Sequence, residues 1–201
     1  MSIGIIDYGI GNLRSIQKGF EYVGATAIIS GDVQQLMSCD KLVLPGVGAF
    51  SHCKKQLDSS FDDISSLISS RPTLGICIGM QLMFDYSLEF GRTEGLGLIK
   101  GYVDKIYTES LPVPHTGWSP LLQKSGNDNP LFSGIPDKSF FYFNHSFSCN
   151  PEQLKSVIGT SDYDGNFVCA VAEGNYYGIQ CHPEKSGFIG LNLLKNFHIF
   201  C

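Results

Sequence analysis

The sequence predicts an α/β fold with an open, mostly parallel sheet covered by helices and additional antiparallel strands in the C-terminal half. In the first half, short apolar runs bounded by Gly, Pro or Asp alternate with segments of helical periodicity. This alternation is typical of parallel strands connected by helices. From about Gly97 onward, β-like runs follow one another with turn residues between them, which favours antiparallel pairing.

The elements of the first half follow from these patterns in order. The run Ile3–Tyr8 is continuously apolar, and Leu13, Ile16 and Phe20 then recur at helical spacing. The third strand is expected to end at a Pro-Gly-Val-Gly turn. We expect strands at Ile3–Tyr8, Ala25–Ile29, Lys41–Leu44 and Pro72–Ile76, and helices at Asn12–Val23, in the stretch ending at Leu57, at Asp62–Ser69 and at Gly79–Tyr86.

The second half is expected to be rich in strands and to end in a helix. The expected β-runs are Leu96–Tyr107, Phe140–Phe147, Ser156–Ser161, Phe167–Glu173 and Tyr176–Gln180. Residues 164–166 and 174–175 contain the Gly, Asn and Asp that favour hairpin turns, and residues 127–130 favour a surface turn. The last helix is expected at Phe188–Phe200, where several leucines and isoleucines are available to a core face.

The composition indicates a globular chain. Of 201 residues, 43% are hydrophobic and 16% are charged, which can form a core within one domain spanning residues 1–201 and excludes a disordered chain. The net charge is −5, and no basic block exceeds Lys54-Lys55, so the sequence gives no support for nucleic-acid binding through phosphate neutralisation.

The chain start and the cysteines bear on location. The start has a short apolar stretch without a basic flank, and no uncharged apolar stretch reaches the roughly 18 residues of a membrane span. The seven cysteines are irregularly spaced and form no CxxC pair, which fits neither a disulfide framework nor a zinc ribbon. We expect a soluble, cytoplasmic protein in which most cysteines are small buried hydrophobic residues.

The strongest local signal is a cysteine at a predicted strand-to-helix turn. Cys77 ends an apolar run and is flanked by Gly75 and Gly79, two residues before and after it. This is the nucleophile-elbow pattern, G-x-nucleophile-x-G, with Cys in place of Ser. A sharp turn projects the nucleophile out of the sheet, and the following backbone offers N–H groups to an oxyanion. The pattern favours a nucleophilic role for Cys77 over that of a buried structural cysteine.

A His-Pro-Glu run supplies the base that a thiol nucleophile needs. In extended backbone, residues i and i+2 point to the same side, so Glu184 can hold the ring of His182. Pro183 between them stiffens the spacing. The sequence therefore predicts a triad of Cys77, His182 and Glu184, against the alternative of a surface histidine near an unrelated carboxylate. None of the histidine spacings predicts a metal site.

Two further segments have open interpretations. Residues 45–48, Pro-Gly-Val-Gly, suit an oxyanion hole as well as a plain turn. His145 fits a structural role about as well as a role in a site. The run Gly9-Ile10-Gly11 lacks the third glycine of a dinucleotide fingerprint and there is no Walker pattern, so the sequence supports no nucleotide cofactor.

Together these segments resemble the class I glutamine amidotransferases, nearly from end to end. The motifs that carry the resemblance lie at residues 6–13, 44–50, 75–82, 114–118, 141–146 and 178–187. The PGVG sequence favours the glutaminase subunits of histidine biosynthesis over anthranilate- and aminodeoxychorismate-type relatives, which tend to carry PGPG. The resemblance implies a flavodoxin-like sheet and a glutaminase that needs no cofactor.

The resemblance also implies roles for individual residues. Cys77 would attack the side-chain amide of glutamine and form a thioester, while His182 moves protons and Glu184 orients it. The other implied roles are oxyanion donation by the backbone amides of Val47 and Ile78, glutamine binding by Gln81, Glu89, His145 and Ser146, and a partner interface at Asn12, Arg14, Trp118 and Lys185. Ammonia would pass, without entering solvent, to a (β/α)₈-barrel cyclase that forms a heterodimer with this chain. From sequence alone, Trp118 could equally be a buried core aromatic.

Some residues depart from the family pattern. Residues 115–119 read HTGWS where HMGWN is usual, residues 143–147 read FNHSF where FVHSY is usual, and Cys181 replaces the usual Phe. These changes fall near the expected partner face and ammonia gate. They leave open a paralogue that supplies ammonia to another synthetase, for example for amidation of a surface sugar. A silent binding module of the same fold is a further alternative, against which the intact Cys77, His182 and Glu184 argue. A Cys peptidase is another, against which the His-Pro-Glu run and the Gly-Met-Gln after the elbow argue.

Overall fold

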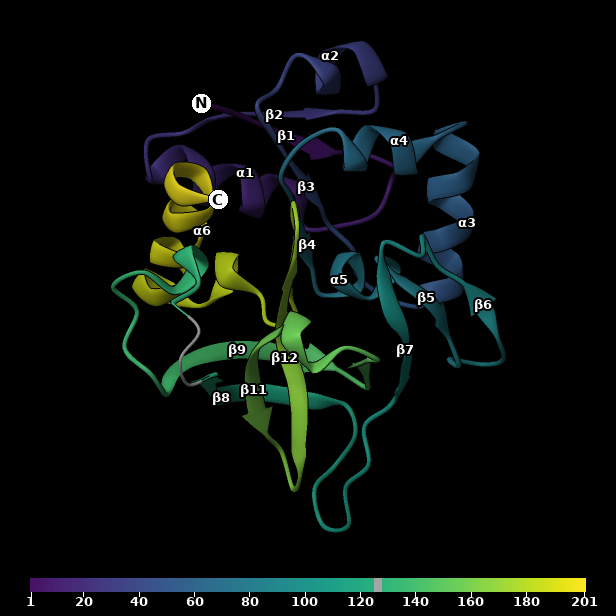
Figure 1. The fold of residues 1–201 in the computed structure, drawn as a ribbon, viewed down its shortest axis with the longest axis vertical. Coiled ribbons are helices and arrows are strands. Elements are labelled where there is room, and N and C mark those ends of the chain that lie inside the picture. Colours follow the sequence, from purple (N-terminus) through teal and green to yellow (C-terminus); the bar gives the residue numbers. More distant parts are fainter. Residues whose placement is uncertain (125–127) are drawn as a thin grey trace.

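The computed structural model describes residues 1–124 and 128–201. Within them, thirteen strands form one sheet whose central order is β2-β1-β3-β4-β13-β12-β10-β7-β5-β6. No helix in these residues has the length and apolar character needed to cross a membrane. The architecture is α/β with a mixed sheet, as the sequence predicts (Figure 1).

Five adjacent strands make the parallel part of the sheet. They are β2 (Thr26–Ser30), β1 (Ser2–Ile6), β3 (Lys41–Leu44), β4 (Thr73–Ile76) and β13 (Tyr176–Ile179). Strands β3 and β4 are buried along their whole length. Because helices cover both faces here, the residues after Lys41 in β3 and after Thr73 in β4 are apolar instead of alternating between apolar and polar.

Helices cover both faces of the parallel part. The α-helices are α1 (Leu13–Tyr22), α2 (Val33–Met37), α3 (Phe50–Ser60), α4 (Ile64–Ser69), α5 (Ile78–Leu82) and α6 (Gly187–Phe200), and the 3₁₀ helices are η1 (Pro130–Phe132), η2 (Leu154–Ser156) and η3 (Pro183–Lys185). Figure 1 shows α1 and α6 on one side of the strands and α3 and α4 on the other. Helices α1 and α6 are in direct contact, because Phe20 meets Phe197 edge-on at 6.3 Å and Gly19 leaves room for Leu194.

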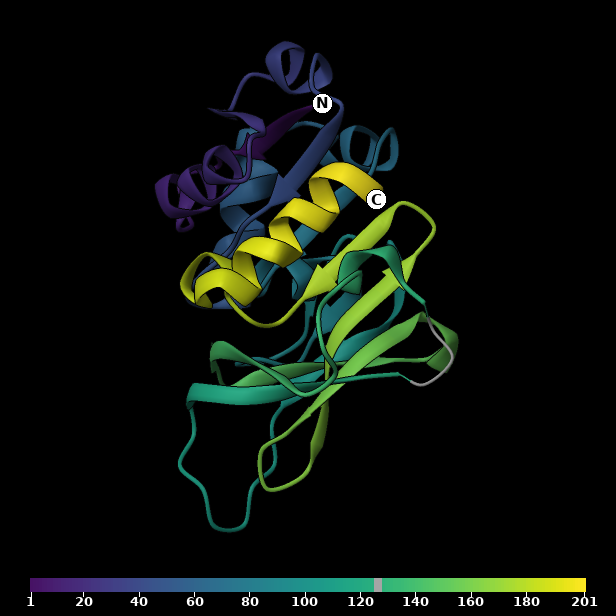
Figure 2. The same ribbon diagram turned by 90° about the vertical axis from the view of Figure 1, so that its left-hand side faces the viewer.

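The remaining strands extend the sheet beyond β13. They are β12 (Asn166–Glu173), β10 (Phe147–Pro151), β7 (Ile99–Lys105), β5 (Phe84–Ser87) and β6 (Thr93–Glu94), with β11 (Val157–Asp162), β8 (His115–Gln123) and β9 (Ser139–His145) off the central path. Apart from the parallel pair of β5 with β7, these strands pair antiparallel. Figure 2 shows β8, β9, β11 and β12 as a layer below the parallel strands and α6. The long pair of β8 with β9 brings the end of β9 toward the parallel part.

Most predicted elements are present, and one is wrong in part. Strand β3 has the expected bounds, and residues 164–166 and 174–175 lie at the turns that join β11, β12 and β13. The helix predicted at Gly79–Tyr86 ends instead at Leu82, because the chain from Phe84 pairs with β7 and then β6. Tertiary pairing overrides the helical pattern there. Of the turn predicted at 127–130, residue 127 lies outside the described residues, and Pro130 begins η1.

Candidate active site

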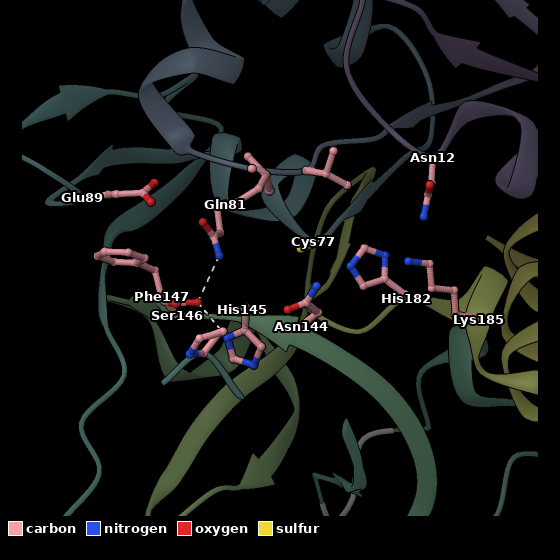
Figure 3. Close-up of a pocket in the computed structure, with 14 residues that line it drawn as sticks. Asn12, Cys77, Gln81, Glu89, Asn144, His145, Ser146, Phe147, His182 and Lys185 are labelled. Carbon is pink, nitrogen blue, oxygen red and sulfur yellow. Dashed lines mark hydrogen bonds between the residues drawn. The ribbon is translucent and has the colours of Figure 1, made fainter. Parts of the chain in front are cut away.

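The candidate site lies at the carboxyl edge of the parallel strands. The segments that leave β1, β3, β4 and β13 carry Asn12, Val47, Cys77 and His182 respectively. Neighbouring parallel strands end at the same edge, so these four segments meet there, where ligands bind in open α/β sheets. All four residues line one cavity of about 480 Å³ (Figure 3).

The cysteine elbow is built from a strained turn and two close backbone contacts. Cys77 has φ 56° and ψ −113°, a conformation that L-residues rarely adopt. Its N–H donates to the carbonyl oxygen of Ile179 at 2.8 Å, which ties the turn to β13. A Cβ on Gly79 would overlap the carbonyl oxygen of Leu44, and one on Gly75 would lie 2.7 Å from the Gly79 oxygen. The two glycines beside Cys77 are therefore required by the space available.

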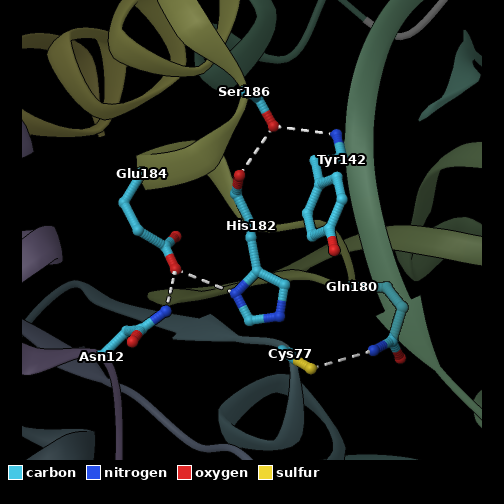
Figure 4. Close-up of polar contacts among 7 residues, drawn as sticks. All are labelled: Asn12, Cys77, Tyr142, Gln180, His182, Glu184 and Ser186. Carbon is cyan, nitrogen blue, oxygen red and sulfur yellow. Dashed lines mark hydrogen bonds and ion pairs between the residues drawn. The ribbon is translucent and has the colours of Figure 1, made fainter. Parts of the chain in front are cut away.

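His182 is held by a buried carboxylate and by strand β9. Its Nδ1 lies 2.9 Å from Oε1 of Glu184, and Asn12 Nδ2 donates to the same oxygen at 3.2 Å (Figure 4). The Glu184 side chain is fully buried, and its Oε2 has no hydrogen-bond partner among the described residues. The His182 N–H donates to the Tyr142 carbonyl at 2.8 Å, and the Ser186 hydroxyl links the Tyr142 N–H to the His182 carbonyl. Glu184 thus holds the ring, while Tyr142 and Ser186 hold the backbone that carries it.

The ring of His182 is placed to carry a proton at the cysteine. With Nδ1 engaged by Glu184, the other ring nitrogen faces Cys77 (Figure 4). Burial alone would lower the pKa of His182, but its hydrogen bonds and charge interactions with Cys77 and Glu184 outweigh burial and raise the pKa to about 10. A thiol beside a protonated imidazole and a buried carboxylate is the arrangement used in nucleophilic acyl transfer.

A glutamine and a glutamate form another wall of the cavity (Figure 3). The Gln81 Nε2 donates to the Phe147 carbonyl at 3.1 Å and to Gln180 Oε1 at 3.0 Å. The buried Gln81 Oε1 has no hydrogen-bond partner in residues 1–124 and 128–201. The buried carboxylate of Glu89 accepts from the Phe50 N–H at 2.6 Å, at the start of α3. An amide oxygen and a carboxylate on one wall favour a ligand that carries an ammonium group.

His145 and Ser146 also line the cavity, but both ring nitrogens of His145 are engaged within the protein. Nδ1 is 2.9 Å from the Phe147 carbonyl, and Nε2 is 3.1 Å from His115 Nδ1. His115 Nε2 in turn lies 2.9 Å from the Ser119 hydroxyl. Because burial lowers the pKa of His115 to about 4 and of His145 to about 3, both rings are neutral at neutral pH. A carbonyl can only accept, so the donors in this chain run from Ser119 through His115 to His145 and the carbonyl.

The two residues predicted as oxyanion donors, Val47 and Ile78, line the same cavity as the cysteine. A Cβ on Gly46 would lie 2.8 Å from the Gly79 nitrogen, so the backbone after β3 is in contact with the backbone after β4. On the side away from the cavity, the thiol of the fully buried Cys53 donates to the Val47 carbonyl at 3.2 Å. The segment after β3 is therefore packed against the elbow on one side and bonded to α3 on the other.

The residues predicted for a partner interface fall into two groups. Asn12 and Lys185 line the cavity, whereas Arg14 is exposed on α1 and does not line it. Trp118 is 54% exposed, so the alternative of a core aromatic is wrong. The Trp118 ring meets the Tyr142 ring edge-on, with 6.1 Å between the ring centres. The Lys185 ammonium lies 5.8 Å from the centre of the Tyr142 ring. Trp118, Tyr142 and Lys185 thus form a surface cluster beside the cavity.

Sequence reasoning missed one polar side chain at the cysteine. Gln180, which directly follows β13, is fully buried, and its Nε2 donates to the Cys77 sulfur at 3.5 Å (Figure 4). The sequence signal was a glutamine inside an apolar run, two residues before His182 and so on the same side of extended backbone. The buried chain of Ser119, His115 and His145 was missed for another reason, since the strand β8 that carries its first two members was not expected.

Comparison with known proteins finds a matching family and relatives that are similar over nearly the whole chain. The family model "Glutamine amidotransferase class-I" matches residues 4–200. A Methanosarcina barkeri protein named imidazole glycerol phosphate synthase subunit HisH is 46% identical over 202 residues, which cover 99% of this chain and 98% of the relative. Proteins of the same name from Geobacter metallireducens and Methanocaldococcus jannaschii are 44% and 43% identical, with at least 97% of each chain covered.

Solved structures agree with the fold. A crystal structure described as a glutamine amidotransferase superposes with a TM-score of 0.75 at 14% sequence identity, covering 99% of this chain and 100% of that one. The PurLQS structure from Thermotoga maritima gives a TM-score of 0.70 at 19% identity, covering 98% of this chain and 95% of that one. At these identities the likeness concerns the arrangement of the elements alone.

Proposed function

This chain belongs to the class-I glutamine amidotransferases, and from that premise we propose that it is the glutaminase subunit of an imidazole glycerol phosphate synthase. It hydrolyses glutamine to glutamate and ammonia. One observation carries the proposal: relatives with that printed name are 43–46% identical over nearly the whole chain. The reported relatives share this one role, which favours it over the amidation of a surface sugar. A cytoplasmic location is part of the proposal.

The proposed chemistry uses Cys77, His182 and Glu184 in two acyl-transfer steps. The Cys77 sulfur attacks the side-chain carbonyl carbon of glutamine, and the C–N bond breaks as His182 gives a proton to the departing ammonia. Water then attacks the resulting thioester, His182 takes a proton from it, and the C–S bond breaks to release glutamate. Glu184 keeps the imidazole in one orientation and stabilises its charged form, a role supported by the 2.9 Å contact at Nδ1.

The walls of the cavity supply the groups that hold the substrate in this proposal. The backbone N–H groups of Val47 and Ile78 receive the oxyanion of each tetrahedral intermediate. The unpartnered Gln81 Oε1 and the Glu89 carboxylate bind the α-ammonium group of glutamine, a role supported by their burial on one wall. Ser146 contacts the substrate directly, and His145 acts through the neighbouring Phe147 carbonyl that it holds.

The proposed partner is the cyclase subunit, a (β/α)₈ barrel that uses the ammonia to form imidazole glycerol phosphate and AICAR. The heterodimer interface would contain Asn12, Arg14, Trp118 and Lys185. The exposed cluster of Trp118 with Lys185 beside the cavity supports this placement, because Trp is enriched at the centres of interfaces. Docking there would put the partner directly over the cavity in which ammonia is released.

Glutamate release from glutamine by the purified chain tests the proposal. The measurement is made with and without the cyclase barrel and its nucleotide ligand, and with the Cys77→Ala variant. We expect the barrel and its ligand together to stimulate the reaction strongly, and the variant to be inactive under all conditions. Activity that is indifferent to the barrel would keep the glutaminase and assign the ammonia to a different acceptor. Activity that survives in Cys77→Ala would refute the mechanism.

A further inference from the structure

The side-chain amide of Gln180 contacts the cysteine of the site, and the mechanism above gives it no role. Gln180 is fully buried, and its Nε2 lies 3.5 Å from the Cys77 sulfur, a hydrogen-bonding distance for this large atom. Its backbone N–H donates to the Cys169 carbonyl at 2.8 Å, which anchors the residue to β12. This hydrogen bond needs an explanation, because a buried amide N–H usually donates to an oxygen and a neutral thiol is a weak acceptor.

The backbone carbonyl of Phe147 fixes the orientation of the Gln180 amide through Gln81, which lies between them. The Phe147 carbonyl can only accept, so the Gln81 atom that faces it must be Nε2. Figure 3 shows this nitrogen turned toward Phe147. The second proton of the same Gln81 nitrogen points to Gln180, so Gln180 must present its oxygen there, at 3.0 Å. Its Nε2 is then directed at Cys77 and cannot exchange places with the oxygen without breaking the pair.

The carbonyl that sets this orientation is itself held. His145 Nδ1 donates to it alongside Gln81, and His115 and Ser119 complete a buried chain behind His145. Burial lowers the pKa of both histidines, so both rings are neutral. With neutral rings, His145 Nε2 accepts from His115, and His115 accepts from the Ser119 hydroxyl. Every hydrogen-bond donor from Ser119 to Gln180 thus has one permitted direction.

We propose that Gln180 is a catalytic residue whose amide N–H donates to the Cys77 sulfur and stabilises its thiolate. The proposal rests on the nucleophilic role of Cys77 given above. A hydrogen bond to an ionised acceptor is roughly twice as strong as one to a neutral acceptor, so the contact favours the thiolate over the thiol. The donor lies directly after β13, the strand that also leads to His182. When the thioester forms, the sulfur loses its charge and the contact weakens, so Gln180 assists both the formation of the thiolate and its departure as a leaving group.

Alkylation of Cys77 by iodoacetamide tests the proposal without substrate or partner. The rate is measured as a function of pH for the full chain, and the modified cysteine is identified by mass spectrometry. The test variants are Gln180→Met, which has no donor, and Gln180→Glu, which keeps the shape of the side chain and puts an oxygen beside the sulfur. At pH 7 we expect Gln180→Met to be alkylated about five- to tenfold more slowly than wild type, in line with the difference in strength between a hydrogen bond to a charged acceptor and one to a neutral acceptor. We expect Gln180→Glu to be alkylated more slowly still.

The shape of the pH profile separates this role from a merely structural one. The profile of each variant should move to higher pH, while the limiting rate at high pH, where the sulfur is ionised, stays within about twofold of wild type. A loosened site would instead raise the limiting rate by exposing Cys77. Gln123→Met is the matched control, since Gln123 Nε2 donates to the Ile135 carbonyl in another part of the fold, and it should leave the profile unchanged.

The possible outcomes distinguish the two proposals. A Gln180→Met profile that coincides with wild type overturns the role of Gln180 and leaves the glutaminase intact. If Gln180→Met does not fold, the isosteric Gln180→Glu decides the same question by the same readout. If glutamate release survives in Cys77→Ala, the nucleophilic role itself fails. In steady-state assays of the complex with the cyclase, we expect Gln180→Met to lower kcat and leave KM nearly unchanged.

Discussion

Replacing Glu184 by glutamine removes the charge behind His182 and keeps the shape of the side chain. Glu184 Oε1 accepts from both His182 Nδ1 and Asn12 Nδ2, so the amide oxygen of a glutamine must take that position. The NH₂ group then occupies the site of Oε2, which is buried and has no hydrogen-bond partner in the part of the chain that the structure describes. The variant therefore has a neutral hydrogen bond in place of a charge-assisted one, and a buried amide group without an acceptor.

The expected loss in rate follows from the strength of that bond. A hydrogen bond to a charged group contributes about 1.5–3 kcal/mol and a neutral one about 1 kcal/mol, so the imidazolium of His182 loses roughly 1.5 kcal/mol of stabilisation. This corresponds to about a tenfold fall in kcat. Because the carboxylate helps to raise the pKa of His182 to about 10, the alkaline limb of the pH–rate profile should also move down by roughly one unit.

The assay is steady-state glutamate release in the presence of saturating cyclase and ligand, measured across pH. Glu94→Gln is the matched control, because Glu94 forms an exposed ion pair with Arg92 at 2.7 Å and such pairs contribute little. We expect Glu94→Gln to retain the wild-type rate and profile. A Glu184→Gln enzyme with an unmoved alkaline limb would refute the assignment of His182 as the proton carrier held by this carboxylate.

Three further predictions concern packing, pH and the partner. Gly79→Ala should lower the free energy of unfolding by more than about 3 kcal/mol in urea titrations, since its Cβ would overlap the Leu44 carbonyl. Gly24→Ala has open space around the new Cβ and should lower it by only about 1 kcal/mol. Equal losses would refute the steric argument. Because burial lowers the pKa of His115 to about 4, between pH 6.5 and about 4 the unfolded chain binds a proton there that the folded chain does not, so folding stability should fall as the pH drops through this range. His115→Asn should weaken that pH dependence of the free energy of unfolding in urea titrations. An unchanged dependence would contradict the argument. Trp118→Ala should weaken cyclase binding at least tenfold in titration calorimetry, as expected for a central interface tryptophan, and unaltered affinity would exclude it from the interface.

The parallel part of the fold could be predicted because its signals are local. Strand β3 is a short apolar run that ends at Pro-Gly, and its bounds were predicted as found. Strand β5 was mistaken for the end of a helix, because residues 79–86 are apolar enough for either structure and only pairing with β7 decides between them. Strand β8 was not predicted because Gly117 and Pro120 interrupt its pattern. These strands depend on partners that are distant in the sequence.

The same distinction holds for the site. Cys77 with its flanking glycines and His182 with Glu184 are local patterns, and the structure brings all three together. The contact between Gln180 and Cys77 joins residues 103 positions apart, and it depends on two strands being neighbours in the sheet. No spacing rule in the sequence encodes that adjacency. The exposure of Trp118 also depends on the layer formed by β8 and β9, which the sequence left open.

The place of β13 in the sheet also determines when activity can arise during synthesis. β13 is the last strand in the sequence, yet it lies between β4 and β12 in the middle of the sheet. A growing chain that ends before Tyr176 leaves the edge of β4 unpaired and lacks both His182 and Glu184. With the proposed triad of Cys77, His182 and Glu184, the ribosome must release the chain beyond Glu184 before any glutamine can be hydrolysed. Shorter chains then release no ammonia, even though Cys77 is made early.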